Sequence, residues 1–188
     1  MDQSSEGCRA ILVTGPPGVG KTTLILKLED YCRGKGLKPA GIITQEVRKG
    51  GQRIGFKLKD LASGTEGWLA KADNGNRPRI GKYAIISEDL EMIGVKALEN
   101  SSSGDAKVVF VDEIGPMEMT SKGFRRAISE LLRSHKIVVA TLKHGSHYEE
   151  VDEALKQGLA EIVELTRENR DAVLEQITSK MENWLSKV

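Results

Sequence analysis

The sequence predicts an α/β fold: a mostly parallel sheet with helices on both faces and an antiparallel hairpin insertion. Three observations support this prediction. Short apolar runs alternate with segments whose apolar residues recur at helical spacing. Several of the apolar runs are rich in β-branched residues, as is typical of strands covered on both faces. Residues 46–71 differ from the rest, because apolar and polar residues alternate there between glycine turns.

The first predicted elements are a strand, a helix and a second strand. The apolar run 10–13 is expected to be a buried strand, and the helix after Gly20 is expected to end at the glycine-containing turn 34–36. Residues 40–44 form the next expected strand. The insertion then contains a hairpin strand near 54–58, with glycine turns before and after it.

The second half of the chain repeats the alternation. Residues 71–83 are polar and contain glycine, so we expect a loop there, and Ser87 is expected to cap a helix that ends near Asn100. The remaining predicted elements are strands at 108–111, 136–141 and 160–165, and helices at 124–132, 148–157 and 173–185. At this length the elements predict a single domain that spans residues 1–188.

The charge balance argues against a nucleic-acid partner. Lys and Arg total 28 and Asp and Glu total 27, so the sequence has no overall basic field. Trp68 and Trp184 are expected to be core or half-buried packing residues. Neither is expected to lie in a basic patch interleaved with aromatic residues, which is what single-stranded nucleic acid prefers.

The sequence also gives no sign of a membrane partner. It contains no apolar run of about 18 residues and no N-terminal signal pattern, so we expect a cytoplasmic protein. Cys8 and Cys32 form no CxxC pair and are expected to be reduced thiols. A monomer is favoured.

A glycine-rich segment between the first strand and the first helix carries the main functional signal. Gly15 to Thr22 reads GxxxxGK[ST], the pattern of a phosphate-binding loop in its required strand-to-helix context. Its backbone N–H groups and the helix N-terminus attract phosphate, and Lys21 is expected to bridge the β- and γ-phosphates during catalysis. Thr22 is expected to bind Mg²⁺ and Thr23 to reach the α-phosphate. The candidate nucleotide-binding residues are Gly15, Pro16, Pro17, Gly18, Val19, Gly20, Lys21, Thr22 and Thr23.

A pair of acids at the end of a buried strand forms the second candidate group. Asp112 is expected to hold Mg²⁺ together with Thr22, because α/β sheets place ligands at the carboxyl ends of their strands. Glu113 is expected to be the catalytic carboxylate that orients the attacking water, and Gly115 follows in the adjoining turn. Thr141 ends another core strand, where it is either a γ-phosphate sensor or an ordinary strand-end threonine.

Four segments together resemble the small nucleoside-triphosphatase family that includes the human cancer-related enzyme and hyperthermophile relatives. They read TGPPGVGKTT, EVRKGGQRIGF, VDEIGPME and ELTRENRD, and the resemblance extends over almost the whole chain. It implies the three-layer P-loop NTPase fold and Mg²⁺-dependent hydrolysis of ATP, GTP and other nucleoside triphosphates, with broad base tolerance and slow turnover. The chain departs from the family pattern at Pro116, where relatives usually carry lysine, and at residues 141–143, where they often have TIP.

Three polar side chains in the second and fourth of these segments are further candidates. Arg48 and Arg170 match family positions and either act at the γ-phosphate or are simply solvated. Asn169 and Arg170 are expected near the base or ribose, because loops at the ligand-binding edge of a sheet commonly contact that part of a nucleotide.

Two other classes of function stay open at this point. A nucleotide or small-molecule kinase would use the hairpin insertion and the loop 72–83 to bind an acceptor and exclude water, which leaves open whether they form a mobile lid. A regulatory module would bind a partner according to its nucleotide state and use hydrolysis as a timer.

Overall fold

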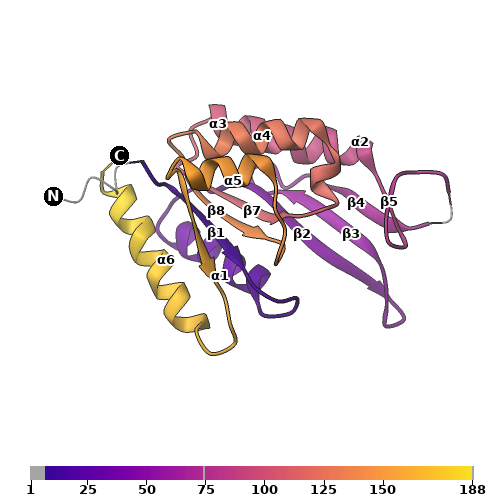
Figure 1. The fold of residues 1–188 in the computed structure, drawn as a ribbon, viewed down its shortest axis with the longest axis horizontal. Helices are drawn as coiled ribbons and strands as arrows, with labels where there is room; N and C mark the ends of the chain where they lie inside the picture. Colours follow the sequence, from indigo (N-terminus) through magenta and orange to yellow (C-terminus); the bar gives the residue numbers. More distant parts are fainter. Residues whose placement is uncertain (1–6, 74, 188) are drawn as a thin grey trace.

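The computed structural model describes residues 7–73 and 75–187 and is built on one nine-stranded sheet (Figure 1). The strand order is β5-β6-β4-β3-β2-β7-β8-β1-β9, and the five strands from β2 to β9 in this order are mutually parallel. These five strands are β1 (Ala10–Thr14), β2 (Ala40–Lys49), β7 (Val108–Ile114), β8 (Ile137–Leu142) and β9 (Ala160–Glu164). The predicted α/β architecture is therefore confirmed.

Helices cover both faces of the parallel half of the sheet (Figure 1). On one face lie α2 (Ser87–Asp89), the π-helical turn η1 (Leu90–Val95), α3 (Lys96–Ser103), α4 (Lys122–Leu132) and α5 (Glu149–Lys156). On the other face lie α1 (Lys21–Gly34) and α6 (Arg170–Leu185). Within the described residues, no helix is both long and apolar enough to span a bilayer.

Alternating side chains of the strands divide the core into two layers. In β1, Ile11 and Val13 pack with α1 and α6, whereas Leu12 packs toward α4 and α5. The central strands β1, β7 and β8 are buried on both faces, which explains why they appear in the sequence as continuous apolar runs, whereas β9 at the edge is partly exposed.

The helix α4 illustrates how the sequence sets an element boundary. Its apolar residues, among them Phe124 and Leu131, recur at helical spacing and are fully buried. The hydroxyl of Ser121 accepts a hydrogen bond of 2.9 Å from the backbone N–H of Phe124 and so caps the helix. A cap of this kind stabilises a helix by about 1 kcal/mol.

The predicted antiparallel insertion is present and is larger than expected. The strand expected at 40–44 continues through the parallel half as the ten-residue β2, turns at Gly50 and Gly51, and pairs with β3. The prediction of a loop at 71–83 was wrong in part, because hydrogen bonding to β4 and within a final hairpin makes segments of it strands. The added strands, called the extension below, are β3 (Gln52–Asp60), β4 (Glu66–Ala72), β5 (Arg79–Ile80) and β6 (Tyr83–Ile85).

Two local predictions also need correction. Ser87 does not cap the helix that follows, because it is already the first helical residue and Ile86 occupies the capping position without a side-chain bond. The strand expected at 108–111 runs on to Ile114, so Asp112 and Glu113 lie within β7 and not after it. The reason is that β7 keeps pairing with β8 as far as Ile114 and Leu142.

Candidate active site

The phosphate-binding loop lies between β1 and α1, as predicted. The loop needs glycine at its start, because a Cβ on Gly15 would lie 2.5 Å from the carbonyl oxygen of Leu165. It needs glycine again at Gly20, whose φ of +108° lies in the region that favours this residue. The turn between them closes with a 3.2 Å hydrogen bond from the N–H of Val19 to the carbonyl of Pro16.

Lys21 begins α1 and bends back over this loop. Its ammonium group donates hydrogen bonds to the carbonyl oxygens of Gly15, at 2.7 Å, and Pro16, at 3.2 Å. Thr22 and Thr23 follow in the exposed first turn of the helix. The positive end of the helix and the lysine charge therefore meet at one place, as a site for a polyphosphate requires.

Asp112 is buried next to the loop and is bonded to Thr141. The hydroxyl of Thr141 donates a 2.6 Å hydrogen bond to Oδ1 of Asp112, and the two side chains are 0% and 4% exposed. Burial raises the pKa of the Asp112 carboxyl, while hydrogen bonds from the hydroxyls of Thr141 and Thr22 act to lower it. The other carboxylate oxygen, Oδ2, is buried without a hydrogen-bond partner among the described residues.

The strand order explains how Thr141 reaches Asp112. β8 lies between β1, which leads into the phosphate loop, and β7, which carries the acids. Thr141 pairs with Val13 on one side of β8 and lies beside the acids on the other. Its position on the central strand makes it the residue that links the phosphate loop to Asp112.

An irregularity in β7 accounts for the placement of two consecutive acids. Val111 pairs with Ala140 and Ile114 with Leu142, so β7 has one more residue than β8 over this interval. In a regular strand, Asp112 and Glu113 would point to opposite faces, but a bulge re-aims a side chain. The charge of Lys21 acts to lower the pKa of both acids against the larger effect of burial, because both carboxylates lie near the phosphate loop.

A third acid, Glu118, joins this group and was not identified from the sequence. A Cβ on Gly115 would lie 2.9 Å from a carboxylate oxygen of Glu113 and 3.0 Å from one of Glu118, so the two carboxylates flank the same glycine. The pKa of Glu118 is raised to about 8, mainly by burial and also by the charges of Glu113 and Asp112. The signal in the sequence was an acid between Met117 and Met119, just before an amphipathic helix.

The pKa of Glu113 itself is raised. Burial is the main cause, and the neighbouring charge of Asp112 adds to it, whereas Lys21 and Lys143 act in the opposite direction. A carboxylate that is partly desolvated is a better proton acceptor than one in water. Glu113 therefore has the chemistry that the sequence interpretation required of it.

The loop after β9 brings Arg170 to the phosphate loop. Its Nε donates a 2.7 Å hydrogen bond to the carbonyl of Val19, and its guanidinium lies over Gly20. Asn169 instead stabilises its own loop: its amide oxygen accepts from the N–H of Thr166 at 2.8 Å and its amide nitrogen donates to the carbonyl of Glu164 at 2.9 Å.

Arg48 lies away from these residues. It pairs with Glu46 and donates a 3.0 Å hydrogen bond to the carbonyl of Gly51, at the tip of the β2–β3 hairpin. It is five residues further along β2 than Ile43, which pairs with Asp112, and strand geometry makes this about 16 Å. Its side chain therefore organises the hairpin turn.

A cavity of about 260 Å³ adjoins the phosphate loop. The aliphatic side chains of Leu165 and Leu174 and the charged ends of Lys27 and Arg170 line it, together with Thr23. It is on the side of the loop that faces α6. Its position next to the proposed α-phosphate contact makes it the candidate nucleoside pocket.

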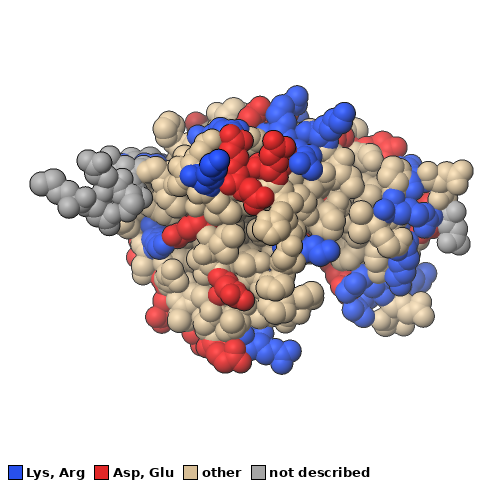
Figure 2. Space-filling view, in the orientation of Figure 1, with Lys and Arg blue, Asp and Glu red and all other residues tan. Residues whose placement is uncertain are grey.

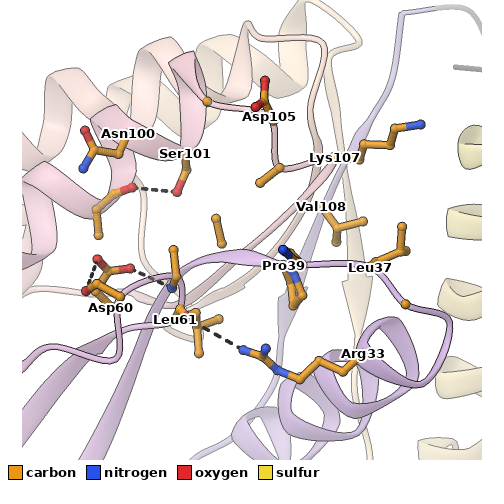
Figure 3. Close-up of a pocket in the computed structure, with 18 residues that line it drawn as sticks. Arg33, Leu37, Pro39, Asp60, Leu61, Asn100, Ser101, Asp105, Lys107 and Val108 are labelled. Atoms are coloured by element: carbon orange, nitrogen blue, oxygen red, sulfur yellow. Dashed lines mark hydrogen bonds between the residues drawn. The ribbon is translucent and has the colours of Figure 1, made fainter.

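A larger cavity of about 790 Å³ lies at the opposite edge of the sheet and does not belong to this site (Figure 3). It is lined by Ala40 and Val108, the first residues of β2 and β7, whereas Asp112 lies near the other end of β7. Figure 3 shows Arg33 at its margin, where the guanidinium donates to the carbonyl of Leu61 at 3.4 Å.

Comparison with known proteins agrees with this site. The sequence profile of the NTPase family matches residues 10–178. The chain is 40% identical over 177 residues to the nucleoside-triphosphatase THEP1 of Thermofilum pendens, covering 94% of this chain and 97% of that one. It is 42% identical over 171 residues to the THEP1 of Methanosarcina acetivorans, covering 90% and 95%.

Solved structures give the same result. The solution structure of a human cancer-related nucleoside triphosphatase matches with a TM-score of 0.79 at 34% identity, covering 94% of this chain and 98% of that one. The crystal structure of THEP1 from the hyperthermophile Aquifex aeolicus matches with a TM-score of 0.78 at 32% identity, covering 92% and 99%. With its phosphate loop, its buried acids and these relatives, the chain belongs to the nucleoside-triphosphatase family of P-loop proteins.

Proposed function

We propose that the protein hydrolyses ATP, GTP and other nucleoside triphosphates to the diphosphate and free phosphate in a slow, Mg²⁺-dependent reaction. The observation that carries this proposal is Asp112. Its buried carboxylate has one oxygen bonded to Thr141 and one without a partner among the described residues, beside Thr22 and Lys21. A buried carboxylate oxygen without a partner is costly unless a ligand completes it.

The residues present fit a magnesium ion. Mg²⁺ prefers oxygen ligands, and the Asp112 carboxylate and the Thr22 hydroxyl supply oxygen in adjacent positions. In phosphoryl transfer the ion neutralises charge on the phosphate oxygens. Thr141 holds the Asp112 carboxylate in place through its 2.6 Å hydrogen bond, as a partner behind a metal ligand does.

The remaining groups have complementary tasks. Lys21 exchanges its bonds to the Gly15 and Pro16 carbonyls for oxygens of the β- and γ-phosphates. Glu113 accepts a hydrogen bond from water and directs it at the γ-phosphorus, and its raised pKa favours the proton transfer that follows. Water is therefore the attacking group in this proposal.

Base tolerance follows from the nucleoside pocket. Leu165 and Leu174 contact a base by its apolar surface, which is common to purines and pyrimidines. Arg170 supplies charge near the sugar and the α-phosphate but is held by the Val19 carbonyl. Slow turnover is the consequence, because a P-loop enzyme without an arginine at the γ-phosphate lacks a large part of its catalysis.

Release of free phosphate from ATP, GTP, CTP and UTP, with and without Mg²⁺, tests the proposal. We expect release from all four nucleotides only with Mg²⁺, and we expect the Glu113→Gln variant to bind nucleotide but release almost no phosphate. Transfer of phosphate to an added acceptor instead of water would identify a kinase. Tight binding with no turnover by the wild type would identify a regulatory module.

A further inference from the structure

Residues 46–85, which comprise the hairpin end of β2 and the extension, carry a net positive charge. Residues 46–85 contain nine Lys and Arg against four Asp and Glu, whereas the rest of the chain has 19 against 23. The net charge of the whole chain is close to zero, but the charged residues are distributed unevenly along it. Figure 2 shows Lys and Arg gathered at the end of the molecule that Figure 1 assigns to β3, β4 and β5. The balanced total charge of the chain therefore does not exclude a nucleic-acid partner at this end of the protein.

Trp68 lies within this basic region, which corrects the expectation that it sits outside any such patch. The ammonium groups of Lys71 and Lys57 lie 4.4 and 5.7 Å from the centre of its ring. The indole extends over Gly55 of the neighbouring strand, since a Cβ there would lie 3.0 Å from the ring. One face of the ring thus rests on the backbone of β3, and Trp68 is partly exposed.

An irregular pairing places these side chains on one face of the sheet. Phe56 pairs with Ala70 and Lys57 with Trp68, so β4 has one extra residue here. The two residues between Trp68 and Lys71 turn into the core, where they are buried. We call the outer surface formed by Lys57, Lys59, Trp68 and Lys71 the basic face; Glu66 lies beside it, 3.7 and 3.9 Å from the two β3 lysines.

The basic face is continuous with the candidate active site. Asp112, Ile43 and Lys59 are paired in register across β7, β2 and β3, so they share one face of the sheet. Two strand spacings separate Asp112 from Lys59, which is about 10 Å. In the described part of the chain α1 and α6 cover this face only over the parallel half (Figure 1), and the helical elements that contact β3 and β4, α2 and η1, pack on the opposite face.

We propose that the basic face binds single-stranded nucleic acid. A partly exposed aromatic ring with lysine ammonium groups beside it on a sheet surface supplies both of the interactions that single strands use: base stacking and phosphate attraction. Among the described residues, Glu66 is the one acid that pairs with the lysines of this face, and it contacts Lys57 and Lys59 at 3.7 and 3.9 Å. The candidate nucleoside pocket lies on the other side of the phosphate loop, toward α6, so a bound strand and a nucleotide do not compete.

Fluorescence anisotropy with labelled twelve-residue oligouridylate and oligodeoxythymidylate, without nucleotide present, tests this proposal. We expect the wild-type protein to bind at least one of them, and we expect Trp68→Ala to weaken that binding about tenfold or more. Trp68→Phe keeps a stacking ring and is expected to retain most of the affinity. The ribose and deoxyribose oligomers distinguish RNA from DNA within the same class of ligand.

Reversing the charge of two lysines of the basic face is a second test, and the same change at two lysines elsewhere is its matched control. The double variant Lys57→Glu/Lys71→Glu is expected to lose at least tenfold in affinity and to reduce the slope of log Kd against log salt by about 1.4, the value for two phosphate contacts to a single strand. Lys38→Glu/Lys156→Glu changes the net charge equally at two exposed lysines outside the extension and is expected to bind like the wild type. ATP hydrolysis without oligonucleotide confirms that each variant is folded.

Three results would overturn the proposal. The first is that the wild type binds neither oligomer. The second is an equal loss in the two double variants, because attraction would then depend on total charge and not on this face. The third is displacement of the oligomer by polyglutamate together with unchanged binding by Trp68→Ala, which would identify an acidic protein as the ligand of the face.

Discussion

The Thr141 hydroxyl and the Asp112 carboxylate form a buried hydrogen bond of 2.6 Å between neighbouring strands. This bond uses one carboxylate oxygen and fixes the direction of the other. The strand-end threonine that the sequence left with two interpretations is thus in contact with the proposed metal ligand. Loss of this hydrogen bond should impair Mg²⁺ binding more than folding stability.

Thr141→Val tests that relationship by replacing the hydroxyl with a methyl group of similar size. We expect activity or metal affinity to fall by about 10- to 100-fold, as for other partners of metal ligands. The half-saturating Mg²⁺ concentration reports it, and Thr141→Ser should restore the wild-type value. Thr44→Val is the matched control, since the Thr44 hydroxyl is buried without a partner among the described residues. A normal Mg²⁺ dependence in Thr141→Val would contradict the assignment.

Gly115→Ala should separate catalysis from folding. The new methyl group would lie within about 3 Å of the carboxylates of Glu113 and Glu118, and these side chains must move to admit it. We expect the phosphate-release rate to drop about tenfold or more, with nucleotide affinity and melting temperature nearly unchanged. Gly34→Ala, in open space at the end of α1, should behave as wild type. Equal rates for the two variants would show that Glu113 does not need its present position.

Arg170→Ala should weaken nucleotide binding. The guanidinium lies against the phosphate loop and lines the candidate nucleoside pocket, so its removal affects both the loop and the ligand. A loss of about 1 to 3 kcal/mol is expected, as for a hydrogen bond to a charged group, and titration calorimetry measures it. Arg126→Ala, at a highly exposed position on α4, is the control. An unchanged Kd would remove Arg170 from the site.

Glu118 should make folding stability depend on pH. Its pKa in the folded protein is about 8, above the usual value of 4.5, so the folded state binds the proton more tightly than the unfolded chain. The contribution to stability is complete below pH 4.5 and is lost as the pH rises through 8. Between pH 6 and 8 the loss amounts to about 2 kcal/mol. Glu118→Gln should remove this dependence in denaturant unfolding, and an unchanged pH profile would refute the role of Glu118.

Much of the fold could be predicted because its strands are covered on both faces. Runs such as 108–111 and 137–141 are buried throughout, so their composition alone identifies them. The prediction was wrong where tertiary pairing decides structure. Arg79–Ile80 forms a strand only because β6 lies beside it, and β7 extends past its apolar run because β8 pairs with it.

The residues of the candidate site also differ in how far the sequence predicts them. Lys21 and Asp112 belong to motifs whose spacing reflects a local geometry, so their positions followed from the sequence. Glu118 ends the segment VDEIGPME without a role that its spacing reveals, and Trp68 belongs to no motif. Their surroundings depend on how the chain folds around Gly115 and on a strand irregularity. The total charge was also misleading, because acids outside the extension offset its lysines and arginines in the sum but not in space.

The continuity of β2 has a mechanical consequence. Its ten residues belong first to the parallel half and then to the extension, with pairing to β7 or β3 along their length. A lid that closes over a nucleotide needs a hinge. The pairing of β2 with β3 is unbroken from Ile43 to Val47, so the strand has no hinge there. The extension therefore continues the same backbone as Ile43, the residue that pairs with Asp112, so a displacement of its outer surface would act directly on that strand.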